Sequence, residues 1–244
     1  MKLKCIATGS SGNCYLLQAD SGEALILDCG ISVKEIKKGL NWDITGVVGC
    51  VVSHAHNDHN KSLTELKGMG IPVYAPYLIP HIAHNTTFRK GGFVVQGFDL
   101  TTVDGRWTHT DANGEPCPIF GFLIMHPEMG KMLYVTDTEL IKWRFKGINH
   151  ILLGVNYDKD LVDTDNPKAN HVFRGHLSID TACDFVKAND SDSLQNVIMC
   201  HLSSENADRD SFIAKMKNAV NMANVDVAEQ GKSWILNNPS ECPF

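Results

Sequence analysis

The chain has 244 residues, of which 43% are hydrophobic and 20% are charged, a balance typical of a globular protein that buries one substantial core. Its 28 acidic and 22 basic residues give a formal net charge of −6, which does not favour a surface that draws long nucleic acids onto itself. No apolar run approaches the length of a membrane span and no secretory leader precedes the first predicted strand, so we expect a cytoplasmic protein with one domain over residues 1–244.

The N-terminal part of the sequence predicts strands followed by helices. Turns rich in Gly, Ser and Asp separate short apolar runs, as in antiparallel strands, at residues 3–7, 14–18 and 24–27. Apolar residues at helical spacing then predict helices over residues 32–40, 62–69 and 76–84, the first with Ser32 as a candidate N-cap. Between the first two helices, the β-branched run 47–52 predicts a buried strand.

The later part of the sequence predicts a second set of strands and helices. Apolar stretches predict strands at residues 93–95, 100–103, 119–125, 132–136, 197–200 and 233–236. Helices are expected at residues 179–187 and 210–222, and the polar stretch 158–174 is expected to form a loop on the substrate side. This pattern predicts a layered α/β protein with helices outside two sheets.

The eight cysteines include no C-x-x-C pair, and most of them lie in apolar runs. We therefore expect buried free thiols in a reducing compartment rather than disulfides.

Three imidazoles and a carboxylate follow the predicted strand 47–52 directly, within the segment Ser-His-Ala-His-Asn-Asp-His. In an extended loop, His54 and His56 point the same way and can bind one ion, whereas Asp58 and His59 turn aside and suit a second ion. Imidazole nitrogen and carboxylate oxygen without thiolate suit zinc, manganese or iron. The alternative is a polar surface loop that is rich in histidine by chance.

These four residues match the H-x-H-x-D-H signature in full, and the chain here resembles the metallo-β-lactamase superfamily. Further segments are similar, in the same order, to the YycJ/WalJ-like branch of that superfamily: residues 8–14, 27–30, 136–138, 156–158, 175–178 and 201–203. The resemblance implies a four-layer αββα sandwich that holds two divalent ions, Zn²⁺ or Mn²⁺, at one edge of its sheets.

The resemblance also implies that the ligand set is completed by later residues. His109 is expected to join His54 and His56 at one ion, His201 to join Asp58 and His59 at the other, and Asp137 to bridge them. One inserted residue separates the context of His109 from the pattern of the branch, so His126 stays open as an alternative. For Asp137 the alternative role is that of a helix N-cap, and for His201 it is that of a core histidine.

Two of these residues carry expected catalytic roles. Asp58 is expected to orient the nucleophile as well as to bind metal. His176 lies in a Gly-His-Leu-Ser segment that resembles the phosphate-facing or proton-donating histidine of tRNA-processing relatives, although it can instead be a structural histidine near a helix start. Tyr157 stands where the branch usually has histidine, so any role for a histidine at that place is lost. Its phenol is expected either to hydrogen-bond or stack on a base, or to be a half-buried packing residue.

The remaining candidates have weaker assignments. Lys168 and Arg174 are expected either to pair with phosphate oxygens or to be solvated loop charges. Four histidines without partners at useful spacing are expected to be structural or exposed: His81, His84, His150 and His171.

These features predict a dinuclear metal-dependent hydrolase in which a hydroxide shared by two ions attacks an ester. The branch resemblance favours a phosphodiesterase or nuclease, with a nucleic acid or nucleotide as substrate. The alternatives are a phosphodiesterase for small or cyclic nucleotides and a thioester or lactone hydrolase of the same superfamily. An iron redox protein is a further alternative, but such relatives generally have Glu at the second histidine of the signature, and this chain has His56 there.

Overall fold

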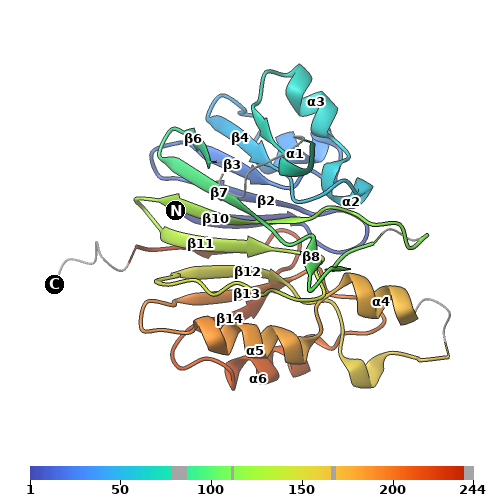
Figure 1. Ribbon diagram of the computed structural model, residues 1–244. Coiled ribbons are helices and arrows are strands. Elements are labelled where there is room, and N and C mark those ends of the chain that lie inside the picture. Colours follow the sequence, from blue (N-terminus) through green and yellow to red (C-terminus); the bar gives the residue numbers. More distant parts are fainter. Residues whose placement is uncertain (79–86, 111–112, 166–168, 239–244) are drawn as a thin grey trace.

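The computed structural model describes residues 1–78, 87–110, 113–165 and 169–238. Two sheets form the centre of the protein (Figure 1). The first has six strands in the order β15-β1-β2-β3-β4-β5. These strands are β1 (Lys2–Ala7), β2 (Cys14–Gln18), β3 (Ala24–Leu27), β4 (Val47–Val51), β5 (Val73–Tyr74) and β15 (Ser233–Ile235). The first three are antiparallel, as the sequence predicts, while β3, β4 and β5 are parallel.

The second sheet has seven strands in the order β14-β13-β12-β11-β10-β7-β6. They are β6 (Thr87–Lys90), β7 (Phe93–Asp99), β10 (Phe120–His126), β11 (Gly130–Val135), β12 (His150–Gly154), β13 (Asn196–Cys200) and β14 (Asn224–Val227). Strands β11 to β14 run parallel, and β10, β7 and β6 are antiparallel to their neighbours. A separate hairpin consists of β8 (Thr102–Val103) and β9 (Arg106–Trp107).

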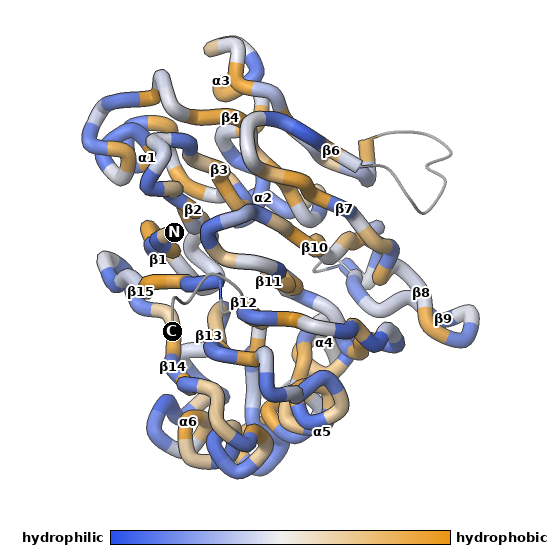
Figure 2. The backbone as a smooth tube through the Cα atoms, turned by 90° about the vertical axis from the view of Figure 1, so that its left-hand side faces the viewer, coloured by the Kyte–Doolittle hydropathy of each residue, from blue (hydrophilic) through white to orange (hydrophobic). Residues whose placement is uncertain are grey.

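Three apolar clusters define four layers, so the expected αββα sandwich is confirmed. One cluster fills the space between the sheets with side chains such as Leu27 and Phe122. A second packs the first sheet against α1 (Val33–Gly39) and α3 (Leu63–Gly68). A third packs the other sheet against α5 (Ile179–Asn189) and α6 (Arg209–Lys217). The tube in Figure 2 shows both sheets between these helix pairs, with β1 beside β15.

Several predicted elements are confirmed by the structure. Ser32 caps α1 through a full capping box with Glu35, which explains why that helix begins where predicted. The helices predicted over 62–69 and 179–187 correspond to α3 and α5.

Other predicted elements differ from the structure. Of the helix predicted over 76–84, Pro76–Leu78 form a short 3-10 helix and the rest lies outside the described residues. The strand predicted over 100–103 is only the short β8 of the hairpin, and the helix predicted over 210–222 ends at Lys217. The stretch 158–174 is not a plain loop, because it contains the 3-10 helix Lys159–Leu161 and much of α4 (Ala169–Gly175).

None of the seven cysteines in the described ranges forms a disulfide, as the sequence predicts. The part of the chain that the structure describes contains no helix long and apolar enough to cross a bilayer.

The parallel strands place their carboxyl ends together. In Figure 1 the arrows of β11 and β12 point right, toward the edge where α2 (Asn57–Asn60) and the β8–β9 hairpin lie. Chain segments that leave parallel strands at such an edge commonly form ligand sites in α/β proteins. The predicted site residues leave β4, β11 and β13 at this edge.

Candidate metal centre

The H-x-H-x-D-H segment leaves β4 and turns at once into the short helix α2. His54 is fully buried at the end of the strand, His56 is the N-cap residue of α2, and Asp58 and His59 lie in the helix. This turn lies so close to the end of β3 that a Cβ at Gly30 would stand 1.7 Å from the carbonyl oxygen of Asp58. Glycine is therefore required at position 30 for the segment to pack there.

The structure brings the predicted ligands together in overlapping groups of three. In each group, one ligand atom from each residue lies within 4.8 Å of those of the others. One group, called cluster 1 below, consists of His54, His56 and His109; another, cluster 2, consists of Asp58, His59 and His201. Asp137 belongs to two further groups, one with His54 and His59 and one with His176 and His201.

Asp137 lies between the two clusters. Its Oδ2 is 2.7 Å from Nε2 of His59 in cluster 2 and 3.8 Å from Nε2 of His54 in cluster 1. Its Oδ1 is 3.6 Å from Nε2 of His201. No helix begins after Asp137 in the described segment 138–147, so the alternative role as a helix N-cap is wrong. The position of its carboxylate is the one that a bridging ligand would need.

Asp137 and His201 both adopt left-handed backbone conformations, with φ of 48° and 56°. Each follows the last residue of a parallel strand by one or two positions. Such conformations are uncommon for residues other than glycine and are concentrated at functional sites. Here the left-handed turn directs each side chain toward the shared edge of the two sheets.

His109 and His126 lie near opposite ends of the strands of the seven-stranded sheet. Nε2 of His109 is 2.9 Å from Nδ1 of His56, and its Nδ1 is 2.9 Å from the carbonyl oxygen of Gly175. His126 ends β10 beside Gly130, the first residue of β11, whereas Asp137 follows the other end of β11. Its Nδ1 accepts a hydrogen bond from the backbone of Glu128. The geometry therefore favours His109 as the third histidine of cluster 1.

The chemistry of His54 fits a bound cation. Its side chain is fully buried, with Nδ1 2.9 Å from the hydroxyl of Ser53. Its Nε2 is also buried and has no hydrogen-bond partner among the described residues. A buried polar nitrogen left without a partner is costly. A divalent ion at cluster 1 would satisfy it, and neutral imidazole with carboxylate oxygen is a donor set that zinc and manganese accept.

Charge is distributed unevenly across the centre. Burial lowers the pKa of His109 to about 3 and, with the neighbouring histidines, holds the pKa of His54 well below its usual value. Burial would raise the pKa of Asp137, but His201 and His59 hold it well below its usual range. Burial likewise acts against a charged His59, yet Asp137 and Asp28 raise its pKa. His54 and His109 in cluster 1 are thus neutral imidazoles, and metal binding at cluster 2 would release a proton from His59.

Asp28 supports the centre and was missed as a functional residue by the sequence analysis. It is fully buried after β3, with a φ of 55°. Its Oδ2 lies 2.6 Å from Nδ1 of His59 and accepts hydrogen bonds from the hydroxyls of Ser53 and Tyr134. Such a carboxylate fixes the orientation of a ligating imidazole. The sequence signals were its place directly after an apolar run, as for Asp137, and its position in segment 27–30, which is similar to the YycJ/WalJ-like branch.

The predicted turn at residues 8–14 also lies beside the centre. The backbone of Asn13 donates to the carbonyl of Asp58, and its side-chain amide is 3.1 Å from Nε2 of His59. The hydroxyl of Thr8 accepts from the backbone of His201. Asn156, from the predicted segment 156–158, donates to the carbonyl of His201.

His176 lies against the centre rather than apart from it. Its Nδ1 is 3.0 Å from Oδ1 of Asp137, and its ring lies 5.9 Å from that of His109 and 5.7 Å from that of His201. It can therefore reach a group held between the two clusters.

The other candidates lie elsewhere. Tyr157 is buried and packs edge-on against Phe173, which agrees with a packing role. His150 is buried and structural, Arg174 is exposed beside the centre, and the side chain of His171 is not described. Three further candidates lie outside the described residues: His81, His84 and Lys168.

Comparison with known proteins identifies the same family that the ligand signature resembles. The Metallo-beta-lactamase superfamily matches residues 7–152, which is more than half of the chain and contains six of the seven predicted ligands. Among curated proteins, the exodeoxyribonuclease YycJ of Bacillus anthracis is 27% identical over 222 residues, covering 82% of this chain and 82% of the relative.

Solved structures share the fold at low identity. Unliganded PDE1 of yeast superposes with a TM-score of 0.67 at 11% identity, covering 96% of this chain and 99% of that one. The metallo-beta-lactamase fold protein YhfI of Bacillus subtilis superposes with a TM-score of 0.64 at 16% identity, covering 96% and 98% of the two chains.

Proposed function

The chain belongs to the Metallo-beta-lactamase superfamily of metal-dependent hydrolases, and we propose that it is a dinuclear phosphodiesterase that acts on nucleic acid. The observation that carries this proposal is the position of Asp137 between two adjoining groups of ligand-type side chains. The similarity to an exodeoxyribonuclease over most of the chain supports the YycJ-like branch and favours a phosphodiester as the bond that is cleaved.

Seven side chains would hold two divalent ions. His54, His56 and His109 would bind the first ion and Asp58, His59 and His201 the second. Asp137 would bridge them, because its Oδ2 lies within 3.8 Å of a nitrogen in each cluster, that of His54 and that of His59. Two such ions lower the pKa of a shared water toward neutrality and neutralise charge on the ester oxygens. We propose Zn²⁺ or Mn²⁺, because the donor set contains only imidazole nitrogen and carboxylate oxygen.

Two residues are proposed to act on the reacting groups. The side chain of Asp58 is partly exposed, and its Oδ2 lies 3.4 Å from Nε2 of both His59 and His201. Its other oxygen can accept a hydrogen bond from an attacking water and so orient it. His176 is half-buried beside Asp137 and can donate a proton or hydrogen bond to the leaving oxygen of a diester.

The experiment that tests this function is a substrate screen with the metal-reconstituted protein. Its substrates are bis-p-nitrophenyl phosphate, cyclic nucleotides, labelled DNA, labelled RNA, nitrocefin and a thioester. We expect cleavage of the chromogenic diester and of at least one nucleic acid. Cleavage of nitrocefin or the thioester without any phosphodiester cleavage would contradict the proposal.

Asp137→Asn is the matched inactive control for this screen. Asparagine tolerates the left-handed backbone that position 137 requires, so the fold should be kept. A neutral amide is a poor bridge between two cations, so phosphodiester cleavage should fall by roughly a hundredfold or more.

We also propose that the protein is cytoplasmic, and fractionation of cells that express it would test this location.

A further inference from the structure

A pocket of about 350 Å³ lies beside the β8–β9 hairpin. Its lining consists of Arg106, Trp107, Thr110, Gly114, Pro116, Glu139 and Arg174. Its size is near the lower end of the range for pockets that hold a small organic ligand. None of these residues belongs to the metal centre described above.

Three sides of this pocket come from chain segments that also carry a site residue. Trp107 precedes His109 by two positions, Glu139 follows Asp137 by two, and Arg174 precedes His176 by two. Hydrogen bonds hold these segments together. The backbone of Glu139 donates to the carbonyl of Thr108, and His109 contacts the carbonyl of Gly175. The pocket is therefore built from the same chain segments that carry His109, Asp137 and His176.

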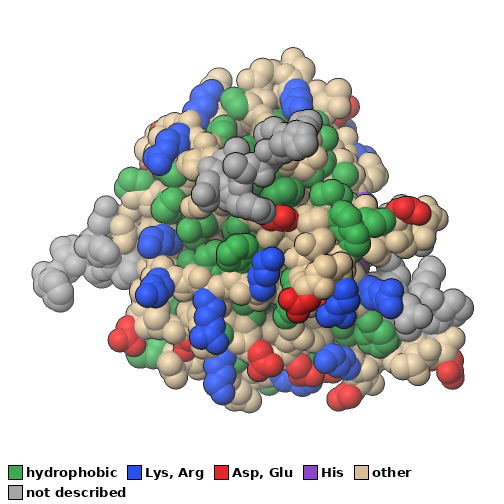
Figure 3. Space-filling view, in the orientation of Figure 1, with side chains coloured by type: hydrophobic (Ala, Val, Ile, Leu, Met, Phe, Trp, Pro, Cys, Tyr) green, Lys and Arg blue, Asp and Glu red, His purple; other side chains and the backbone are tan. Residues whose placement is uncertain are grey.

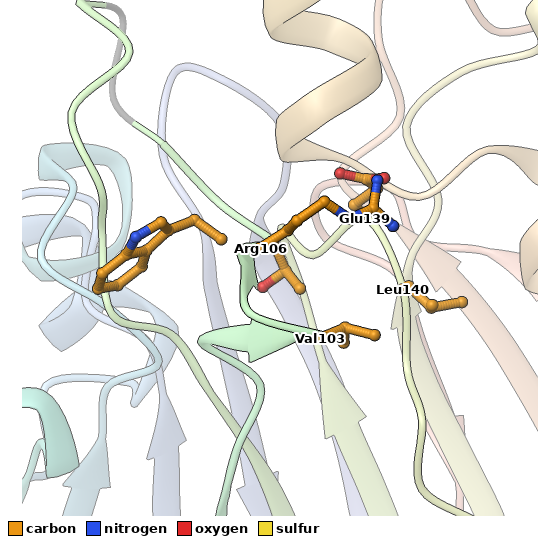
Figure 4. A pocket seen from close by; sticks show the side chains of 6 residues that line it. Val103, Arg106, Glu139 and Leu140 are labelled. Atoms are coloured by element: carbon orange, nitrogen blue, oxygen red, sulfur yellow. The ribbon is translucent and has the colours of Figure 1, made fainter.

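The chemistry of the pocket suits a nucleotide. The indole of Trp107 is 42% exposed, which leaves surface for an aromatic base to stack on. Arg106 and Arg174 are both exposed and offer planar donors for phosphate oxygens. Glu139 is the carboxylate among the described lining residues, and Arg106 extends toward it in Figure 4, which shows a smaller adjoining pocket that also contains Val103 and Leu140. The described lining residues thus provide two guanidinium groups and one carboxylate, in a chain of net charge −6.

The basic and aromatic character continues beyond the pocket. Lys142, Trp143 and Arg144 are exposed on the segment that follows Glu139. This segment is fixed to the hairpin side, because Lys142 donates to the carbonyl of Thr102 and the indole of Trp143 donates to the carbonyl of Asp99. Figure 3 shows Lys and Arg side chains over this face of the molecule, with hydrophobic side chains and some Asp and Glu among them. Such interleaving is typical of surfaces that bind an unpaired nucleic-acid strand.

We propose that this pocket binds the nucleotide next to the scissile phosphodiester of a single-stranded nucleic acid. The base stacks on Trp107, and its phosphates contact Arg106 and Arg174. The exposed run from Lys142 to Arg144 then contacts the following nucleotides, which a cyclic mononucleotide does not have. Stacking on an indole requires a base that is not stacked in a duplex, so the strand must be unpaired at that point. This inference rests on the proposed function and specifies its substrate class.

Binding is measured with metal-loaded, full-length protein and a fluorescent oligothymidylate whose phosphorothioate linkages resist cleavage. We expect Trp107→Ala to raise the Kd about tenfold and Trp107→Phe to raise it much less, because phenylalanine keeps an aromatic face. Arg174→Ala should raise the Kd and lower the slope of log Kd against log salt by about one.

The matched controls are Trp42→Ala and Arg89→Ala. Trp42 is 62% exposed and follows α1, and Arg89 lies on the edge strand β6. Both should bind like the wild type.

Three results would overturn this inference. The first is a Kd for Trp107→Ala equal to that of Trp42→Ala. The second is equal affinity for the strand and for its duplex, and the third is equal affinity for the strand and for thymidine monophosphate. Hydrolysis of bis-p-nitrophenyl phosphate by the same preparations keeps the two proposals apart. If the wild type cleaves that diester while Trp107→Ala binds normally, only the nucleotide pocket is wrong; if the wild type cleaves no phosphodiester, the proposed function is wrong.

Discussion

The hydroxyl of Tyr134 donates a 2.5 Å hydrogen bond to Oδ2 of Asp28, the same oxygen that lies 2.6 Å from Nδ1 of His59. Tyr134 lies near the end of β11 and Asp28 follows β3, so this contact joins the two sheets. It also fixes the ring of His59 with Nε2 facing Asp137. The interior between the sheets therefore takes part in orienting a proposed metal ligand.

We expect Tyr134→Phe to weaken metal binding at cluster 2 about tenfold, because Asp28 would lose one of the donors that hold it in place. The phenyl ring keeps the aromatic contacts with Tyr15 and Phe122, so the fold should persist. Competition with a chromophoric chelator measures the affinity. The control is Tyr74→Phe, which removes a hydroxyl from the same apolar cluster. Equal losses in the two variants would show that the contact with Asp28 has no special role.

His109→Ala should lose one of two bound ions, whereas His126→Ala should keep both. The reason is that His109 lies within cluster 1, while His126 lies near the opposite end of the strands of its sheet, beside Glu23. Elemental analysis of the purified variants measures the stoichiometry. Loss of metal from the His126 variant with retention in the His109 variant would reverse the assignment.

His176→Ala should retain both ions yet lose most activity on a nucleic acid, whose alkoxide leaving group needs a proton. Activity on bis-p-nitrophenyl phosphate should survive better, because nitrophenolate leaves without that help. Initial rates on both substrates are compared in one preparation with its metal content measured in parallel. Equal losses on both would indicate a phosphate contact instead, and no loss on either would make His176 structural.

His150 should make the protein less stable as the pH falls, independently of the metal centre. Its Nε2 lies 3.1 Å from the carbonyl of Met129, and its Nδ1 lies 2.9 Å from the amide of Asn196. Burial lowers its pKa from 6.5 to about 4. The unfolded chain therefore binds a proton more readily than the folded one, and stability is lost between these two values as the pH falls.

This contribution amounts to about 2 kcal/mol between about pH 7 and about pH 5. His150→Gln removes the titrating group, so its free energy of unfolding should fall less steeply over that interval than that of the wild type. Urea unfolding at several pH values measures both. Identical pH dependence in the two proteins would contradict a neutral, buried His150.

Much of the centre could be predicted because its residues follow apolar runs. His54, Asp137 and His201 each come directly after a strand that the sequence predicts, and parallel strands bring such positions to one edge. The later ligands were proposed from the resemblance to the metallo-β-lactamase superfamily, and their place after apolar runs supported that assignment.

The supporting contacts could not be predicted in this way. Asp28 is 106 positions from Tyr134, and its role appears only when the two sheets pack together. The strand β12 was also missed, since it is buried along its whole length and shows no alternation. The pocket beside the hairpin combines Arg106 with Arg174, and nothing in either local sequence relates one to the other.

The most direct test of the whole account is a metal titration followed by phosphodiester hydrolysis in the same sample. Metal-free protein is titrated with Zn²⁺ or Mn²⁺ while cleavage of a labelled single-stranded oligonucleotide is recorded, with Asp137→Asn as the inactive reference. Because two clusters share Asp137, we predict that activity rises until about two equivalents are bound and then stays constant. Full activity at one equivalent, or two bound ions without any cleavage of the strand, would contradict a dinuclear phosphodiesterase.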